Sequence, residues 1–545
     1  MPSPSKSRPI QRFCAWLFCV LSAASALATS EGFAQAVPTL TQPASQSNPA
    51  PLPSAVPVSS TLPPFLFNGA LDFSEGYTTN AGGVSTSKDD SFTRGILSLG
   101  LHYSSALLRA DANYSLTGYY YNHFHNLDQW TQRLNLASTS ELVPDHLFLN
   151  FNAFAAPTAL SRVGRLNPNE DFVDINNRQS YGYVATPVYR MRFGDYAVSE
   201  TSLSVSQLFF TSPSNSSPAT SLPIAPADDT TSTTITERIS SGPHFGRFRW
   251  DAAVSYASVD QTSQSIRQGE IGVNIAYALN RTVALLATTG YDQFDSSVPL
   301  TQPVSGPIAL GGIQLSGPTL SLVTLAGARY GFPTFTGSAK WQPTPTFTVI
   351  GSLTDAVSTP ESSALGDLST LGVSAQGAFA DSQSGYWETR GQALFPQFAT
   401  VSPISTGGLA LDNSINRERR AQLAFVHQDE RNQYGLSFFG TMRDRLNVTT
   451  DPTPGKSWLY GARVNASRKL RRDLVGYAAI SYSYANEFGG RDRIVEADAG
   501  LTYMLNKDVD CYLTAQYLHR SSKDQVVADV PLSEFAASIG VRRKF

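Results

Sequence analysis

From residue 65 onward, the chain alternates between apolar and polar residues with a period of two, which is typical of β-strands with one wet and one apolar side. The segments 458–467, 495–503, 509–517 and 535–545 show the pattern most clearly. In 495–503 the two faces are Val495, Ala497, Ala499, Leu501 and Tyr503 against Glu496, Asp498, Gly500 and Thr502. No amphipathic helix separates such segments. The pattern predicts an all-β protein.

The connections between the predicted strands alternate between long and short. Counted from both ends, the long ones are 78–91, 156–178, 399–416, 447–456, 487–492 and 523–533. The short ones between them are 104–105, 142–145, 194–196, 430–432, 470–473 and 506–508. Outer-membrane barrels have short periplasmic turns and longer extracellular loops. The chain is therefore predicted to form a transmembrane antiparallel up-and-down β-barrel whose two ends face the periplasm.

Counting strands gives about 16–22, because residues 294–333 are ambiguous. The run from Leu320 to Tyr330 fits a spanning strand, part of a bent strand or a loop. A barrel of this width is too large for strand side chains to fill, so its lumen holds water or inward-folded loops. No globular region precedes the strands, and we therefore expect no plug domain.

The N-terminal 64 residues differ from the rest in composition. Residues 1–36 combine basic Lys6, Arg8 and Arg12, a short apolar core and a small-residue cleavage site, which predicts a signal peptide and export to the bacterial outer membrane. Residues 37–64 form a Pro/Ser-rich periplasmic tail, either a spacer or a polyproline segment that docks a partner. Residues 65–545 are the predicted barrel.

Composition agrees with this division. The chain has 23 Tyr and 30 Phe, only 15% charged residues and a net charge of -3. Half-apolar strands average to a mean hydropathy near zero, here -0.16. So small a net charge for this length argues against nucleic acid as a partner.

The last predicted strand carries a candidate assembly signal. Its apolar face ends in Phe545, and the pattern polar-x-Gly-x-x-hydrophobic-x-aromatic is filled by Ser538, Gly540 and Phe545. Arg543 departs from the pattern, and its long side chain can extend its charge to the periplasmic headgroups. The barrel assembly machinery is the expected partner of this strand.

Three short motifs resemble the "putative β-barrel porin 2" family of outer-membrane barrels. They are the first strand 71–80, the arginine-aromatic strand Tyr189–Gly194 before a tight turn, and a Trp-x-Pro-Thr turn at 341–346. Together with Phe545, the resemblance covers about residues 65–545. It implies an association with exopolysaccharide export and its components, and it supplies no catalytic residues.

Charged residues on the predicted inner face are the main functional candidates. They are Arg109, Asp111, Arg133, Arg190, Arg192, Arg249, Asp251, Glu270, Arg463, Glu496 and Asp498. A ring of one sign would predict ion selectivity, but both signs occur. These residues either bind a solute or neutralise one another in the wall. Tyr512 also faces inward and would suit the flat face of a sugar.

The seven histidines offer weaker chemistry. His123 and His125 share one face of a predicted strand, but no nearby acid or cysteine completes a metal site, and none is expected. His244, His427 and His519 lie outside any Gly-x-Ser-x-Gly motif, and no glycine-rich phosphate loop is present. We expect no enzyme activity, no metal and no cofactor.

The sequence thus predicts a porin-like barrel that passes a polar solute or an exopolysaccharide across the outer membrane. The alternatives are a non-conducting barrel whose loops bind neighbours and, more distantly, a lipid-modifying hydrolase at the barrel rim. Outer-membrane lipid and lipopolysaccharide are expected to surround the barrel.

Overall fold

The computed structural model describes residues 65–81, 88–159, 177–211, 229–359, 414–447, 455–487, 490–523 and 532–545. The predicted signal peptide and the Pro/Ser-rich tail lie outside these ranges. Neither of the two short 3-10 helices in the described ranges, η1 (His125–Leu127) and η2 (Pro243–Phe245), is long and apolar enough to cross a membrane.

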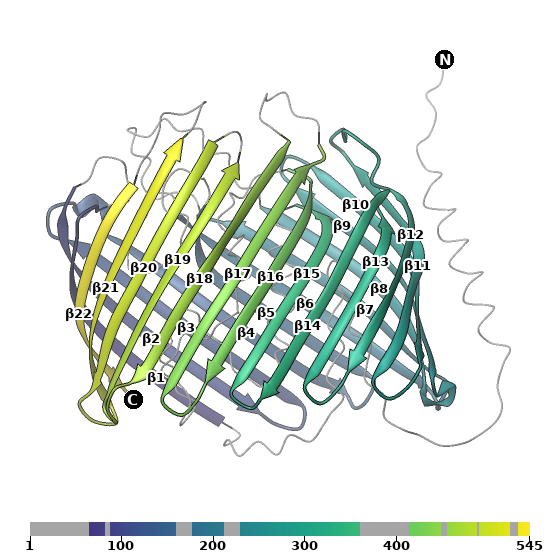
Figure 1. Cartoon of the computed structure of the whole chain (residues 1–545), viewed down its shortest axis with the longest axis horizontal. Helices are drawn as coiled ribbons and strands as arrows, with labels where there is room; N and C mark the ends of the chain where they lie inside the picture. Colours follow the sequence, from purple (N-terminus) through teal and green to yellow (C-terminus); the bar gives the residue numbers. More distant parts are fainter. Residues whose placement is uncertain are drawn as a thin grey trace.

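The described residues form one 22-stranded antiparallel sheet that closes on itself (Figure 1). Each strand pairs with the next along the chain, and β1 pairs with β22. The strands are β1 Phe65–Thr78, β2 Asp90–Ser104, β3 Leu108–Tyr121, β4 Gln129–Val143, β5 Leu147–Ala159, β6 Asn177–Phe193, β7 Ala197–Phe210, β8 Thr230–Ser241, β9 Phe248–Gln261, β10 Ser265–Ala278, β11 Val283–Ser296, β12 Gly306–Ser316, β13 Leu320–Arg329, β14 Phe332–Thr344, β15 Phe347–Ser358, β16 Asn416–Gln428, β17 Asn432–Arg445, β18 Lys456–Lys469, β19 Leu474–Glu487, β20 Gly490–Met504, β21 Val509–Lys523 and β22 Leu532–Lys544.

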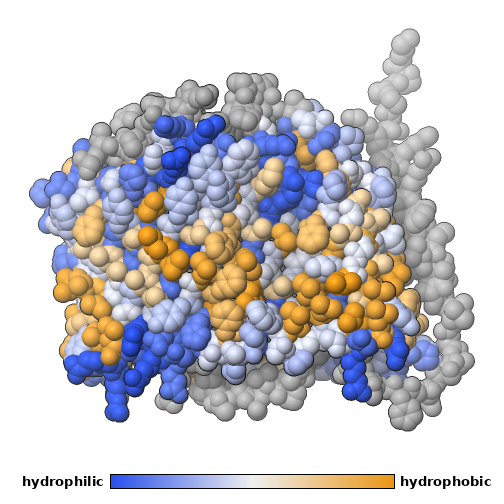
Figure 2. Space-filling model, in the orientation of Figure 1, coloured by the Kyte–Doolittle hydropathy of each residue, from blue (hydrophilic) through white to orange (hydrophobic). Residues whose placement is uncertain are grey.

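The outer face of the barrel is apolar across its middle. Figure 2 shows hydrophobic residues in a band between hydrophilic residues at the two ends. The large exposed side chains alternate with buried ones along each strand, as Phe65, Phe67, Leu71 and Phe73 do in β1. Because Arg or Lys facing lipid at mid-membrane costs about 2–4 kcal/mol, this face is the one in contact with the membrane.

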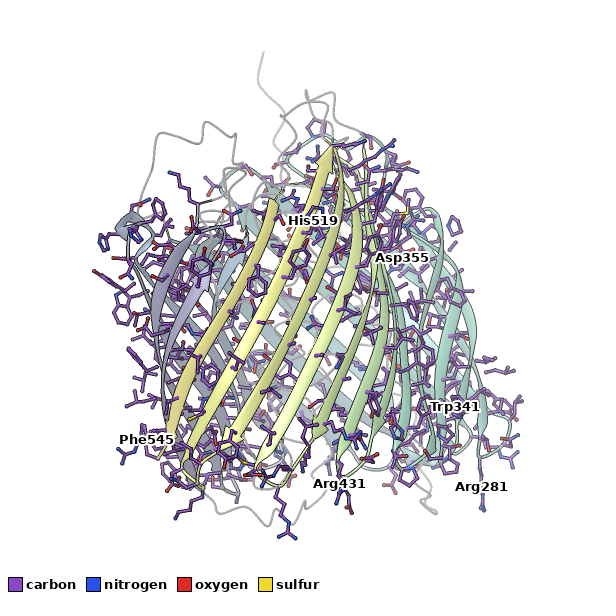
Figure 3. The ribbon with its side chains drawn as sticks, turned by 60° about the vertical axis from the view of Figure 1, so that its left-hand side comes forward. Arg281, Trp341, Asp355, Arg431, His519 and Phe545 are labelled. Atoms are coloured by element: carbon purple, nitrogen blue, oxygen red, sulfur yellow. The ribbon has the colours of Figure 1, made fainter. Side chains whose placement is uncertain are left out.

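The two ends of the barrel differ in their connections. Arg281 and Arg431 lie in short turns at the same end as Phe545, whereas Asp355 and His519 lie toward the opposite end (Figure 3). Short turns identify the periplasmic end. The predicted short turns are therefore present at one end, and β22 runs from the extracellular to the periplasmic end. Most residues of the predicted loops 156–178, 399–416, 447–456 and 523–533 lie outside the described ranges.

The ambiguous region 294–333 contributes two spanning strands, β12 and β13. Both are short, and they are followed by a tight extracellular turn in which Tyr330 and Gly331 have positive φ angles of 56° and 77°. The segment 297–305 crosses above this low part of the rim, where the Thr301 N–H donates to the Leu446 carbonyl at 2.7 Å. Val304, Tyr330 and Leu446 are buried together there.

The predicted Trp-x-Pro-Thr turn is only partly correct. Strand β14 continues through Trp341 to Thr344, with a register irregularity between these two residues. Only Pro345 and Thr346 connect it to β15. The irregularity lets proline enter the strand, because proline has no N–H to donate to a ladder.

Backbone pairing joins β1 to β22 at the seam of the barrel, and two glycines there leave space for aromatic rings. Gly69 and Phe545 exchange reciprocal N–H···O=C bonds of 2.9 Å, and the Phe545 ring lies against Gly69. A Cβ atom on Gly540 would lie 2.5 Å from the Tyr512 ring and 2.8 Å from Ser74 Cβ. These glycines make room for aromatic rings on neighbouring strands.

Candidate solute-contact site on the inner wall

The strand register places all eleven predicted inner-wall charges on the face opposite the membrane. Paired residues of neighbouring strands point to the same side. Arg463 pairs with Ser481 and Ser481 with Glu496, while their chain neighbours Val464 and Ile480 are exposed on the outer face. The same reasoning applies to the candidates on β3, β4, β6, β9 and β10.

Four residues form what we call the mid-wall patch: Arg463 on β18, Ser481 on β19, and Glu496 and Asp498 on β20. Arg463 Nη2 lies 3.4 Å from Asp498 Oδ1, and Ser481 Oγ donates to Glu496 Oε2 at 2.9 Å. The Arg463 and Asp498 side chains remain 45% and 22% exposed. The patch presents a cation, carboxylates and a hydroxyl to the lumen, groups that bind hydroxyl-rich solutes.

A second group of predicted residues lies at the periplasmic half of the wall. Arg109 Nε lies 3.7 Å from Asp111 Oδ2, and His102 Nδ1 also contacts Asp111. Arg190 pairs with Glu200 at 2.7 Å. Arg192 is exposed near the end of β6. These residues give the periplasmic mouth both signs of charge.

Arg133 and Arg249 are half-buried on β4 and β9. Arg133 pairs in the ladder with Ser115, and Arg249 with Ala276. The structure does not bring either arginine into the mid-wall patch.

Two predicted acids belong instead to buried ion pairs. Asp251 lies 3.4 Å from Arg238. Glu270 lies 2.8 Å from Arg329, which also contacts Asp292 at 2.9 Å. Arg329 is 8% exposed and Asp292 is fully buried, while Glu270 stays 30% exposed, so one arginine serves two carboxylates within the wall.

Sequence reasoning missed most of these buried charges. The "buried rim pairs" are Arg329–Asp292, Arg417–Asp355, Arg443–Glu418 and Arg520–Asp492, all toward the extracellular end. Arg329 lies in the ambiguous region, and Asp492 falls in the predicted loop 487–492, which the structure shortens. A usable signal was present for two of the pairs, since Arg443 and Glu418, like Arg520 and Asp492, fall on inner-face positions of adjacent strands. Arg329 and Asp292 are separated by β12, and Arg417 and Asp355 share the register of the outward Leu423 and Leu353.

The seam holds a further buried cluster that was also missed. Tyr512 donates its hydroxyl proton to Asp72, and Arg94 Nη2 donates to the Tyr512 oxygen at 3.1 Å. Arg542 Nη2 contacts Asp72 Oδ2 at 3.1 Å. Tyr512 faces inward as predicted, but its ring is buried over Gly540 and is not open to a sugar.

The histidines have mainly structural partners. His123 Nδ1 lies 2.8 Å from Asp90, and His125 lies 3.5 Å from Asp128, so the acids that the sequence did not place are present. These two histidines do not share a strand face, because β3 ends at Tyr121 and His125 begins η1. Within the described ranges no three metal-ligating side chains gather.

The comparisons with known proteins agree with this geometry. Residues 433–545, from β17 to the last strand, match the family model "putative beta-barrel porin 2". The protein is an outer-membrane β-barrel. The predicted resemblance is confirmed for these residues. No curated protein matches the sequence.

Solved structures similar to this barrel include iron-uptake proteins. The siderophore receptor PirA from Pseudomonas aeruginosa is 10% identical, with 88% of this chain and 80% of that chain covered and a TM-score of 0.37. The FrpB iron transporter from Neisseria meningitidis is 10% identical, with coverages of 88% and 82% and a TM-score of 0.36. At these identities the likeness concerns the fold alone.

The fold-class prediction needs one correction, which concerns the plug domain. The barrel has 22 strands, a size at which the lumen of outer-membrane transporters is plugged. The prediction that excluded a plug is therefore wrong, because the lack of a globular region before the strands does not exclude one at this size. In the described ranges no plug is evident.

Proposed function

We propose that the barrel conducts polar, hydroxyl-rich solutes across the outer membrane through its lumen. The observation that carries the proposal is the contrast between the two faces of one closed sheet. The outer face is apolar, while the inner face presents the mid-wall patch and many Ser, Thr, Asn and Gln side chains. Both signs of charge line the wall, so we expect weak ion selectivity.

The solute class follows from the groups in the mid-wall patch. Arg463 donates in a fixed planar fork, while Glu496 and Asp498 accept hydrogen bonds. Alternating donors and acceptors suit the hydroxyls of saccharides, which supports an oligosaccharide or an exopolysaccharide strand as cargo. Diffusion, or pressure from synthesis upstream, would drive passage.

Planar-bilayer conductance of the refolded protein tests the proposal. We expect stable unitary currents, and liposomes containing the protein should swell in an osmotically balanced solution of a small oligosaccharide. The absence of current and swelling from a correctly folded barrel would contradict conduction and favour a barrel whose loops bind neighbours.

We also propose that the barrel is not an enzyme. His427 and His519 stack on Tyr434 and Tyr517, and the His244 ring packs at a tilt against Tyr196. We expect the three alanine variants to leave the lipid composition of the membrane unchanged in mass spectra. A change in lipid acylation in any of them would support the hydrolase alternative.

A further inference from the structure

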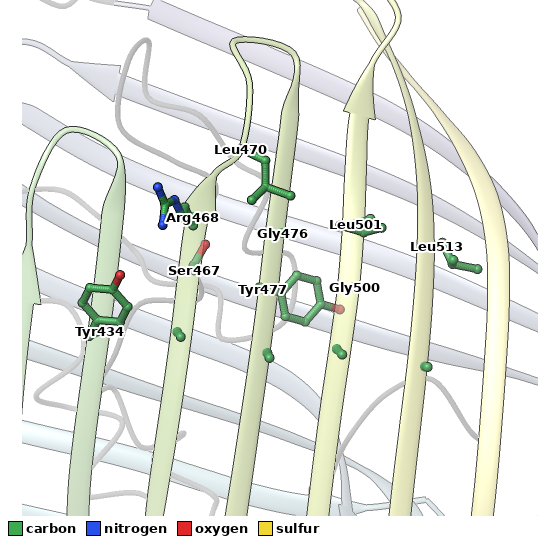
Figure 4. Close-up of a pocket in the computed structure, with 13 residues that line it drawn as sticks. Tyr434, Ser467, Arg468, Leu470, Gly476, Tyr477, Gly500, Leu501 and Leu513 are labelled. Atoms are coloured by element: carbon green, nitrogen blue, oxygen red, sulfur yellow. The ribbon is translucent and has the colours of Figure 1, made fainter.

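The outer face of the barrel is hollowed over strands β17–β21 near the periplasmic end (Figure 4). The groove has a volume of about 510 Å³. Its floor consists of residues with little or no side chain, Ala466, Gly476, Ala478, Ala499 and Ala515. Larger side chains border it: Tyr434, Leu470, Leu501 and Leu513.

Strand pairing shows that the groove opens toward the membrane. Ala466 pairs with Tyr434, and Ala499 lies between Ala478 and Ala515 in the ladder. Tyr434, Leu501 and Leu513 are among the exposed large side chains of the outer face. On β1 the same face carries the aromatic rings of Phe65, Phe67 and Phe73. The block of small residues on β18–β21 leaves a depression instead.

The groove lies at the level of the periplasmic leaflet. Leu470 belongs to the β18–β19 turn, where its N–H donates to the Leu474 carbonyl at 2.8 Å. This turn is at the same end of the barrel as Phe545. The periplasmic leaflet of an outer membrane consists of phospholipids, whereas lipopolysaccharide occupies the other leaflet.

A cation stands at the headgroup end of the groove. Arg468 is exposed, lines the groove and lies two residues before Leu470, near the end of β18. In the described part of the chain Arg468 makes no ion pair, unlike Arg471, whose Nε lies 3.5 Å from Asp473. A guanidinium binds phosphate oxygens with two parallel hydrogen bonds.

We propose that this groove binds one anionic phospholipid of the periplasmic leaflet. One acyl chain lies along the alanine and glycine floor, where it regains the dispersion contacts that an unfilled hollow lacks. The phosphate pairs with Arg468. The bound lipid becomes a component of the barrel wall. It lies on the membrane face of strands β18–β20, whose lumen face carries the mid-wall patch.

Native mass spectrometry of the barrel refolded with phosphatidylglycerol and purified in detergent tests this assignment. We expect one retained lipid in the wild type, loss of that lipid in Ala499→Leu and Ala478→Leu, and about tenfold lower retention in Arg468→Gln, from loss of a charge-assisted hydrogen bond. Phosphatidylcholine should be retained less than phosphatidylglycerol.

Matched controls come from the same face. Ala497→Leu lies one outward position further along β20, and Arg543→Gln removes an outward cation at the same rim on β22. Both should retain the lipid, and heat-modifiability on gels checks that each variant folds. Three outcomes would overturn the proposal. The wild type and Ala499→Leu could retain the lipid equally, or the wild type could retain the two lipids equally. The third is that the protein forms a dimer which Ala499→Leu dissociates.

Discussion

The charges of the inner wall fall into two regions that contrast in burial. In the buried rim pairs, Arg329 and Asp292 are 8% and 0% exposed and lie 2.9 Å apart. In the mid-wall patch, Arg463 and Asp498 are 45% and 22% exposed and lie 3.4 Å apart. In both pairs one strand separates the arginine from the carboxylate, so residue type and strand spacing do not separate the two regions.

The difference shows how one wall serves two purposes. Charges removed from water must be paired, because an isolated buried charge costs several kcal/mol. The rim pairs therefore link β11 to β13, β15 to β16, β16 to β17 and β20 to β21 at the extracellular end, and they offer little to a solute. Charges left open to the lumen contribute little to stability, and they are accessible to a solute, as the proposed function requires.

The largest effect is expected from breaking a rim pair. Arg329→Met leaves Asp292 buried without its partner, and we expect it to lower the free energy of unfolding by about 3–5 kcal/mol. Urea titration of the folded barrel, followed by tryptophan fluorescence, measures the change. A loss under about 1 kcal/mol, the range for exposed pairs, would show that the two regions do not differ energetically.

The seam cluster gives a second, smaller test of burial. Gly540→Ala places a methyl group 2.5 Å from the Tyr512 ring, and such overpacking costs about 1–3 kcal/mol. Gly95→Ala is the control, because a Cβ there meets nothing within 4 Å. Equal urea midpoints for the two variants would show that the Tyr512 ring is free to move away.

Asp429, in an exposed periplasmic turn, tests how much hydrogen bonding stabilises a charge that is not buried. Hydrogen bonds from the Asn432 side chain and from the backbone N–H groups of Arg431 and Asn432 lower the pKa of Asp429 from 3.8 to about 2. Because the pKa of Asp429 is lower in the folded than in the unfolded protein, the ionised carboxylate stabilises the barrel at any pH above the unfolded-state pKa. This stabilisation is lost as the pH falls through the folded-state pKa of about 2. The urea midpoint of the wild type should fall more steeply than that of Asp429→Ala between about pH 4 and pH 2. Parallel curves would contradict this.

The smallest stability effect is expected in the mid-wall patch. Arg463→Met should change the free energy of unfolding by less than about 1 kcal/mol, because its pair with Asp498 is open to water. The same variant should lower the binding of an oligosaccharide, measured as blocking of single-channel current. A loss of unfolding free energy as large as that of Arg329→Met would show that the mid-wall patch and the buried rim pairs do not differ in their contribution to stability.

The sequence was sufficient for an antiparallel barrel because alternation and loop lengths are local patterns, but it left the strand number between about 16 and 22, and the exclusion of a plug was wrong. Strand direction, the outward rows of β18 and β20–β22, and the inner-face position of all eleven candidates could be read from it. Burial could not, because it depends on strands far apart in the chain. From the sequence alone, Tyr512 is an inward aromatic residue open to a sugar, because Asp72 and Gly540, which bury its ring, lie on other strands. The acids near His123 and His125 are Asp90, from β2, and Asp128, which follows the 3-10 helix η1.

Region 294–333 was ambiguous for a similar reason. Its strands are short, and the turn at Tyr330 and Gly331 has no loop to mark it. Arg329 lies in this region and was therefore not predicted as an inner-wall charge, although its partners Glu270 and Asp292 lie outside it.

Thiol accessibility tests the central claim that the mid-wall patch faces the solute path. In a Cys511→Ser background, Ser481→Cys places a thiol in the patch, and the neighbouring Ile480→Cys places one on the outer face. We expect a charged methanethiosulfonate reagent to reduce the bilayer current of Ser481→Cys and to leave that of Ile480→Cys unchanged. An unaffected current in Ser481→Cys, with labelling verified by mass spectrometry, would contradict the account.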